Sequence, residues 1–157
     1  MKNKACEIKE NPIAEMKAQK NDAELSHLID AFKRTDKAVS ATRDYIYEND
    51  NLSEYDIAKY LEEQFKAQGA IGLSFNSIVA KDKNSALAHY SKSSKDEIVK
   101  DGSLVLIDCG GYFEGGLATD ITRVFVKGEP SNLHKKIYTT DLCSVEFKQA
   151  IYESSES

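Results

Sequence analysis

The feature of this sequence that most constrains its fold is a glycine-rich stretch between two apolar segments, within residues 104–126. The first apolar run ends at Asp108, and the second begins just after Asp120. Four glycines lie between these two aspartates: Gly110, Gly111, Gly115 and Gly116. Because glycine adopts positive φ and lets backbones approach closely, the chain can reverse here and return antiparallel. The sequence therefore predicts a strand pair that brings the two carboxylates near one another.

The segments around this turn have the patterns expected of strands. Residues 104–107 are continuously apolar, which is typical of a strand buried on both faces. Residues 119–126 alternate in polarity and are rich in β-branched side chains. Residues 73–79 also alternate, so a further strand is expected there. Together these segments predict an antiparallel sheet.

Helical periodicity precedes the predicted sheet. A first helix is expected from a cap at Asn21 or Asp22 up to the polar cluster at residues 49–51, where the periodic pattern breaks. A second helix is expected to begin at the cap Ser53 and to stop at Gly69, a residue that commonly ends helices. Each helix is predicted to carry its apolar residues along one face.

The chain is predicted to form one domain of the α+β class. A final helix is expected over residues 132–152, with Ser131 as its cap. Two helices, an antiparallel sheet and a helix, in that order, define the class. Residues 1–12 are interpreted as an extended lead-in, a remnant of a preceding domain, and residues 13–157 as the domain itself.

Composition argues against several classes of function. With 41% apolar and 30% charged residues, the chain resembles an ordinary globular domain, and no run approaches the roughly 20 apolar residues that cross a membrane. Lysines and glutamates are interspersed at a net charge of −5, which argues against nucleic-acid binding. The three cysteines form no Cys-x-x-Cys pair, so we expect a structural role for them and a reducing, cytoplasmic location.

Paired carboxylates point toward metal chemistry. Two carboxylates held close together stay ionised only when a cation lies between them, and their hard oxygens suit Mn²⁺ or related divalent ions. Two such ions commonly lie about 3.5–4 Å apart in hydrolytic sites. The plainer interpretation is that Asp108 and Asp120 are ordinary turn residues beside glycines. The spacing alone does not decide between these alternatives.

The residues around the two aspartates resemble a known signature. Residues 108–110 read Asp-Cys-Gly and residues 119–123 read Thr-Asp-Ile-Thr-Arg. They resemble the Asp-x-Gly and Thr-Asp-Ile-Thr-Arg motifs of the pita-bread metallopeptidases, the M24 family of Xaa-Pro aminopeptidases and prolidases. Further runs resemble that family in order, at residues 11–13, 17–21, 24–25, 75–80, 84–90 and 128–131. The resemblance covers roughly residues 11–142 and implies a partial pita-bread fold, with helices packed on a curved antiparallel sheet.

The resemblance implies roles for four residues. Asp108 would bind one metal ion, and Asp120 would bridge two, with Mn²⁺ as the first choice and Co²⁺ or Zn²⁺ as alternatives. Thr122 would lie on the same strand face and hydrogen-bond close to the metal. His89 would contact substrate and help move a proton near the scissile bond. The plainer interpretation of His89 is a loop histidine without a catalytic role.

The activity that the resemblance implies is metal-dependent release of an N-terminal residue that precedes proline. Its partners would be peptides with proline in the second position. The paired aspartates argue against a creatinase, which lacks the metal ligands. The context of His89 and the stretch 128–138 favour an Xaa-Pro aminopeptidase over a prolidase.

The family pattern also requires ligands that this sequence lacks. It completes the metal site with a later histidine and two later glutamates, whereas the sequence departs from the pattern from about Cys143. We therefore expect a truncated N-terminal half of the catalytic domain, with an incomplete site, marginal stability and no activity of its own. The alternative is a non-catalytic fragment or association module of the same fold. Self-association is expected, because a half domain exposes apolar surface and strand edges.

Overall fold

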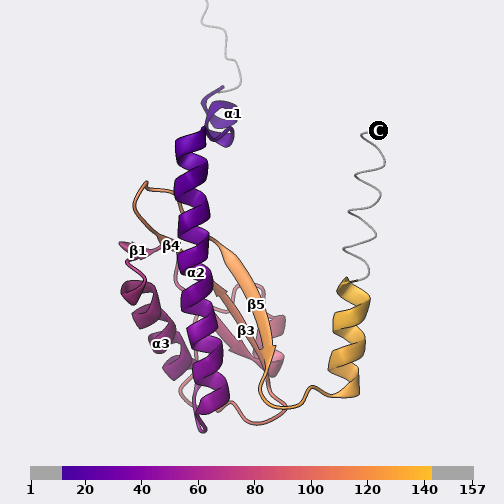
Figure 1. Ribbon diagram of the computed structural model, residues 1–157. Helices are drawn as coiled ribbons and strands as arrows, with labels where there is room; N and C mark the ends of the chain where they lie inside the picture. Colours follow the sequence, from indigo (N-terminus) through magenta and orange to yellow (C-terminus); the bar gives the residue numbers. More distant parts are fainter. Residues whose placement is uncertain (1–11, 143–157) are drawn as a thin grey trace, which may run out of the picture.

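The structure, a computed structural model, describes residues 12–142 (Figure 1). In chain order its elements are α1 (Ile13–Ala18), α2 (Asp22–Glu48), α3 (Glu54–Ala67), β1 (Gly72–Leu73), β2 (Ile78–Lys81), the 3₁₀ helix η1 (Asp82–Ala86), β3 (Leu104–Cys109), β4 (Gly111–Tyr112) and β5 (Ile121–Val126). Residues 132–142 are also helical. This order confirms the predicted α+β class. The lead-in before Pro12 and the final helix beyond residue 142 lie outside the described residues.

The two long helices begin where the sequence predicts. The backbone N–H of Asn21 donates to Glu24, and that of Glu24 donates back to the Asn21 side chain, both at 2.9 Å. The same reciprocal capping box joins Ser53 and Asp56 at the start of α3, at 3.0 and 3.2 Å. Each box satisfies backbone donors that have no partner inside the helix. Local side-chain chemistry thus fixes both starting points.

Strand β3 lies at the centre of a three-stranded antiparallel sheet with β2 on one side and β5 on the other. Strands β1 and β4 form a second, two-stranded sheet. The single strand predicted over residues 73–79 is wrong, because this segment is split between the two sheets. The chain pairs with β4 up to Leu73 and then changes partner to β3 from Ile78.

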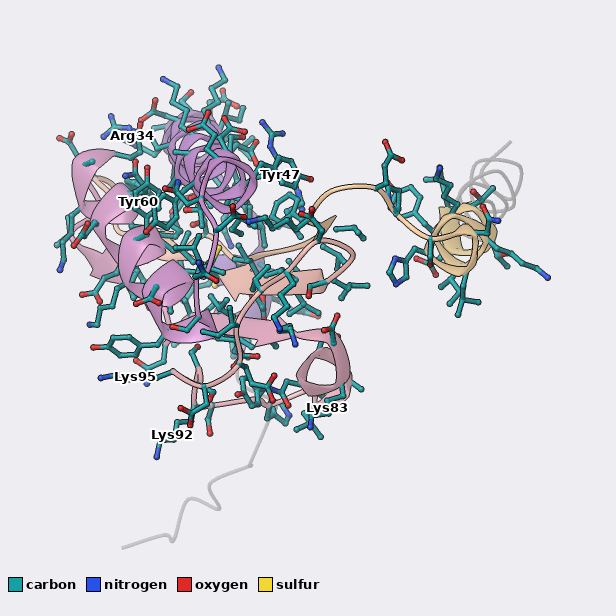
Figure 2. All side chains as sticks on the ribbon, turned by 90° about the horizontal axis from the view of Figure 1, so that it is seen from below. Arg34, Tyr47, Tyr60, Lys83, Lys92 and Lys95 are labelled. Atoms are coloured by element: carbon teal, nitrogen blue, oxygen red, sulfur yellow. The ribbon has the colours of Figure 1, made fainter. Side chains whose placement is uncertain are left out.

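Helices α2 and α3 cover one face of the sheet, as the view along α2 shows (Figure 2). On that face Val105, Ile107 and Cys109 are fully buried, together with Phe65 of α3. The intervening residues of β3, of which Asp108 is one, are only partly buried. The prediction of burial on both faces for residues 104–107 is therefore wrong for the described chain, since the helices cover a single face. The other face is here called the open face of the sheet.

The first turns of α2 extend past the sheet toward α1 (Figure 1). Consequently Leu25 and Ile29, which the periodicity assigns to the apolar face of this helix, are 43% and 56% exposed, and complete burial begins only at Ala31. After β5 the chain leads to the helix at residues 132–142, which stands apart from the sheet (Figure 1). Among the helices of residues 12–142, none combines the length and apolar character needed to cross a bilayer.

Candidate functional site

The candidate site begins with the pairing of β3 and β5. In this ladder Asp108 lies directly opposite Thr122, and the Thr122 hydroxyl donates a 2.8 Å hydrogen bond to Oδ1 of Asp108. Within residues 12–142, no hydrogen bond reaches the second oxygen, Oδ2. The Asp108 carboxylate is thus held through Oδ1, and Oδ2 can still accept a ligand.

Asp120 lies on the same face as Asp108. The Thr119 N–H donates to the Gly111 carbonyl at 3.0 Å, which continues the register of the ladder two residues beyond the Cys109–Ile121 pair. Thr119 and Ile121 are buried, whereas Asp120 and Thr122 are exposed. Since side chains alternate along a strand, Asp120 projects with Thr122 and lies diagonally from Asp108, about 7–8 Å away between Cα atoms. The predicted hairpin is present, and its two carboxylates share one face.

Two glycines of the turn are required by close packing. A Cβ on Gly110 would lie 1.9 Å from the Thr119 carbonyl oxygen and 2.4 Å from Oγ of Ser74, so only glycine fits. Gly115 has φ +96°, and a Cβ there would lie 2.8 Å from the ring of His27 on α2. The glycines therefore allow the hairpin to close tightly and to pack against α2.

Thr119, the residue before Asp120, forms hydrogen bonds with several separate parts of the chain. Its buried hydroxyl shares a 2.8 Å hydrogen bond with the hydroxyl of Thr35 on α2 and accepts one from the Gly111 N–H at 3.0 Å. Its carbonyl accepts a 2.9 Å bond from Ser74. These contacts fix the backbone that carries Asp120. Sequence reasoning missed Thr35, because its partner lies 84 residues away.

Cys109, between Asp108 and Gly110, faces the core. Burial raises the pKa of its thiol to about 12, and the negative charge of Asp108 adds to the rise while Arg123 opposes it. The thiol is therefore protonated at neutral pH and is a poor nucleophile or ligand. This agrees with the predicted structural role for Cys109; Cys6 and Cys143 lie outside the described residues.

His89 is exposed, on the segment that follows η1. The stretch from Leu87 to Lys92, which includes His89, lines a shallow cavity of about 460 Å³. Strand β2 runs from Ile78, opposite Asp108, to Lys81 at the far end of β3, so this segment starts away from the carboxylates. Across residues 12–142, no three His, Cys, Asp or Glu side chains gather as a metal-binding group. The structure thus brings Asp108, Thr122 and Asp120 together and leaves His89 outside that group.

Glu54, which sequence reasoning did not single out, is a buried carboxylate at the first position of α3. Its oxygens accept four hydrogen bonds: from the Lys81 N–H at 2.7 Å, the Asn84 amide at 3.0 Å, the Tyr90 hydroxyl at 2.6 Å and the Ser94 N–H at 2.9 Å. All four donors lie within residues 81–94, the stretch that includes η1 and His89. Burial, and then the bond to Glu54, raise the pKa of Tyr90 to about 12.

Comparison with known proteins identifies the family. Residues 26–146 match metallopeptidase family M24, and the chain belongs to this family. It is 32% identical over 142 residues to a protein of Aspergillus flavus named probable Xaa-Pro aminopeptidase P, and 34% identical over 131 residues to the uncharacterized peptidase YqhT of Bacillus subtilis. These matches cover 86% and 81% of the chain.

Solved structures of the family share the fold. The X-Pro aminopeptidase of Thermotoga maritima superposes with a TM-score of 0.73 at 33% identity, and the prolidase of Pyrococcus furiosus with 0.72 at 31%. Both matches cover 81% of this chain, which confirms the expected partial pita-bread fold. The chain spans 35% and 36% of these two structures, and 22% and 36% of the Aspergillus and Bacillus proteins.

Proposed function

We propose that this chain supplies part of the active site of a metal-dependent peptidase that releases an N-terminal residue preceding proline. The observation that carries this proposal is the placement of Asp108 and Asp120 on one open sheet face, with Thr122 bonded to Asp108. Family membership and relatives named as Xaa-Pro aminopeptidases support it. Prolidase activity is the alternative, because a prolidase is equally similar in fold.

The donor set on the open face fits a hard divalent cation. Asp108 and Asp120 offer carboxylate oxygens, which suit Mn²⁺ first and Co²⁺ or Zn²⁺ as alternatives. A pair of such ions would acidify a water molecule for attack on the peptide carbonyl. Of the residues described, Asp108 and Asp120 would hold the ions. Oδ2 of Asp108, which accepts no hydrogen bond from residues 12–142, is the oxygen available for this role.

Two further side chains would serve this site without coordinating the ions. The Thr122 hydroxyl fixes the orientation of the Asp108 carboxylate, as groups behind metal ligands commonly do. The exposed imidazole of His89 can bind a peptide group or accept and donate a proton. We propose that His89 contacts the peptide substrate.

The carboxylates on the open face form only part of a dinuclear site. Affinity for a metal rises with the number of ligands and with how well their geometry is preformed, and two carboxylates are few. We therefore propose that the chain by itself binds metal weakly and does not hydrolyse peptides. Self-association through the open face and a cytoplasmic location belong to the same proposal.

A peptidase assay tests this function. Two proteins are incubated with Mn²⁺ and either Ala-Pro-Ala or the dipeptide Ala-Pro: the chain alone, and the chain joined to the coding sequence that follows it in its gene. We expect the joined protein to cleave Ala-Pro-Ala, and its Asp120→Asn variant to lose this activity. Preference for the dipeptide would identify a prolidase.

Two results would overturn the proposal: cleavage that Asp120→Asn leaves intact, or no cleavage of either substrate by a folded joined protein that binds Mn²⁺. A chain with no coding sequence after it, and without activity, would support the non-catalytic alternative.

A further inference from the structure

Hydrogen bonds to Glu54 attach residues 81–94, which include His89, to helix α3. Its carboxylate accepts hydrogen bonds from Asn84 and Tyr90, which flank His89 in the sequence, and the Asn84 amide also donates to the Tyr90 hydroxyl at 3.2 Å. The first and last residues of the stretch 84–90 are therefore both hydrogen-bonded to the buried Glu54 carboxylate. Between them, the Leu87 N–H donates to the Asn84 carbonyl and its carbonyl accepts from the Tyr90 N–H, both at 3.1 Å, and the residue is 58% exposed.

A carboxylate is the side chain that these contacts require. All four groups that reach Glu54 act as donors, and a carboxylate is the side-chain group that only accepts. Its place at the first position of α3 adds the favourable interaction of a negative charge with a helix N-terminus. Glutamine would replace one acceptor oxygen with a donor, so at least one buried N–H or O–H would lose its partner.

Other contacts hold the neighbouring residues but do not hold those around His89. The backbone of Ser94 and Glu97 accepts bonds from Tyr55 and Glu54 N–H groups at 3.2 Å, which attaches the end of the segment to α3. Lys83 and Lys92 point outward from the segment, away from α2 (Figure 2). The Lys95 ammonium group, close to Ser94, lies 4.5 Å from the centre of the Tyr55 ring on α3. The side chain of Glu54 is thus the principal anchor of residues 84–90.

We propose that Glu54 is a positioning residue for His89: its buried carboxylate holds residues 84–90 in the conformation that presents the imidazole to a peptide. What His89 does with that peptide rests on the proposed function. The anchoring itself concerns the free chain and is tested without substrate.

Hydrogen exchange and NMR of the free chain test the anchoring. In Glu54→Gln we expect amides of residues 81–94 to exchange about ten- to a hundredfold faster, as loss of hydrogen bonds to a charged group predicts, while amides of α2 and β3 keep their rates. The His89 imidazole resonances should shift or broaden, whereas those of His27 and His134 stay in place. Glu63→Gln, at an exposed position of the same helix, is the matched control and should change neither.

Three results contradict the proposal. One is exchange in residues 81–94 within about twofold of wild type, with unchanged His89 resonances, in a folded Glu54→Gln variant. Another is faster exchange of similar size throughout the chain, which would mean a general structural role. If Glu54→Gln does not fold, Tyr90→Phe decides, because it removes one donor only. That variant should show the same local change at about tenfold, and no local change would refute the anchoring.

A separate titration of Ala-Pro-Ala into the chain with Zn²⁺, which has a filled d shell and does not broaden NMR resonances as Mn²⁺ does, addresses the function of His89. A shift of the His89 resonances in wild type, weaker in Glu54→Gln, is expected. No shift in wild type would contradict the proposed role of His89 in peptide binding and would leave the anchoring result intact.

Discussion

Thr122 and Asp108 lie directly opposite each other on β5 and β3, joined by a 2.8 Å hydrogen bond from the threonine hydroxyl to the carboxylate. Their pairing fixes the register of the hairpin. A slip of one residue would turn Asp120 and Thr122 toward the helices and Ile121 toward solvent, so burial of Ile121 protects the arrangement of the carboxylates. The core and the candidate site are thus specified by the same register.

Gly110→Ala should destabilise the chain by about 1–3 kcal/mol, as overpacking of a close contact does. The added Cβ would lie 1.9 Å from the Thr119 carbonyl oxygen and would force the two strands apart. Gly72→Ala is the matched control, because no atom lies within 4 Å of its added Cβ. Chemical denaturation measures both variants, and equal stabilities would show that the close approach is not required.

Thr119→Val keeps the shape of the side chain but removes a buried hydroxyl that bonds to Thr35 and Gly111. We expect a loss of about 1–3 kcal/mol in unfolding free energy, because buried partners are left unsatisfied. Thr139→Val, at the surface of the last helix, should change stability by less than about 0.5 kcal/mol. Combining Thr119→Val with Thr35→Val should cost less than the sum of the two single changes, and strict additivity would contradict a shared hydrogen bond.

The starts of the helices and the hairpin could be predicted from sequence because their causes are local. The cap expected at Asn21 or Asp22 is Asn21, and the cap expected at Ser53 is present. Each cap forms a capping box with the residue three positions on, Glu24 or Asp56. The glycines of the hairpin lie inside the turn that they permit. Short-range chemistry of this kind is visible in any single sequence.

The remaining features depend on distant partners. Residues 73–79 alternate like one strand, yet their partners in β3 and β4 divide them between two sheets. Glu54 sits in the first helical turn, where an exposed carboxylate is the usual expectation, but its donors come from 27 to 40 residues further along the chain. Local periodicity predicts neither the strand partners of residues 73–79 nor the hydrogen-bond donors of Glu54. The metal-binding roles of Asp108 and Asp120, and the role of His89, remain predictions.

The unfolding free energy of the chain should fall as the pH rises above the ordinary pKa of Tyr90. In the folded chain burial and Glu54 raise the pKa of Tyr90 from 10.0 to about 12, so the folded state keeps a proton that the unfolded state loses. The contribution is complete below pH 10 and disappears as the pH passes through the folded value. The difference in unfolding free energy between wild type and Tyr90→Phe should therefore shrink between about pH 10 and 12. A constant difference would contradict the raised pKa.

Cys109 should resist alkylation in the folded chain. Its side chain is fully buried and the pKa of its thiol is raised to about 12, mainly by burial, so little thiolate exists at neutral pH. We expect iodoacetamide to modify Cys109 only after addition of denaturant, as peptide mass spectrometry would show. Rapid modification of Cys109 in the native chain at neutral pH would mean that this strand opens readily.

Divalent metal binding by the folded chain tests the central claim most directly. Titration calorimetry with Mn²⁺ compares wild type with Asp108→Asn, Asp120→Asn and the control Asp44→Asn, which alters an exposed carboxylate on α2. We expect weak saturable binding to wild type and to the control, reduced about tenfold or more in each of the other two variants. Binding that Asp120→Asn leaves unchanged, or no saturable binding to folded wild type, would contradict a metal site on the open face.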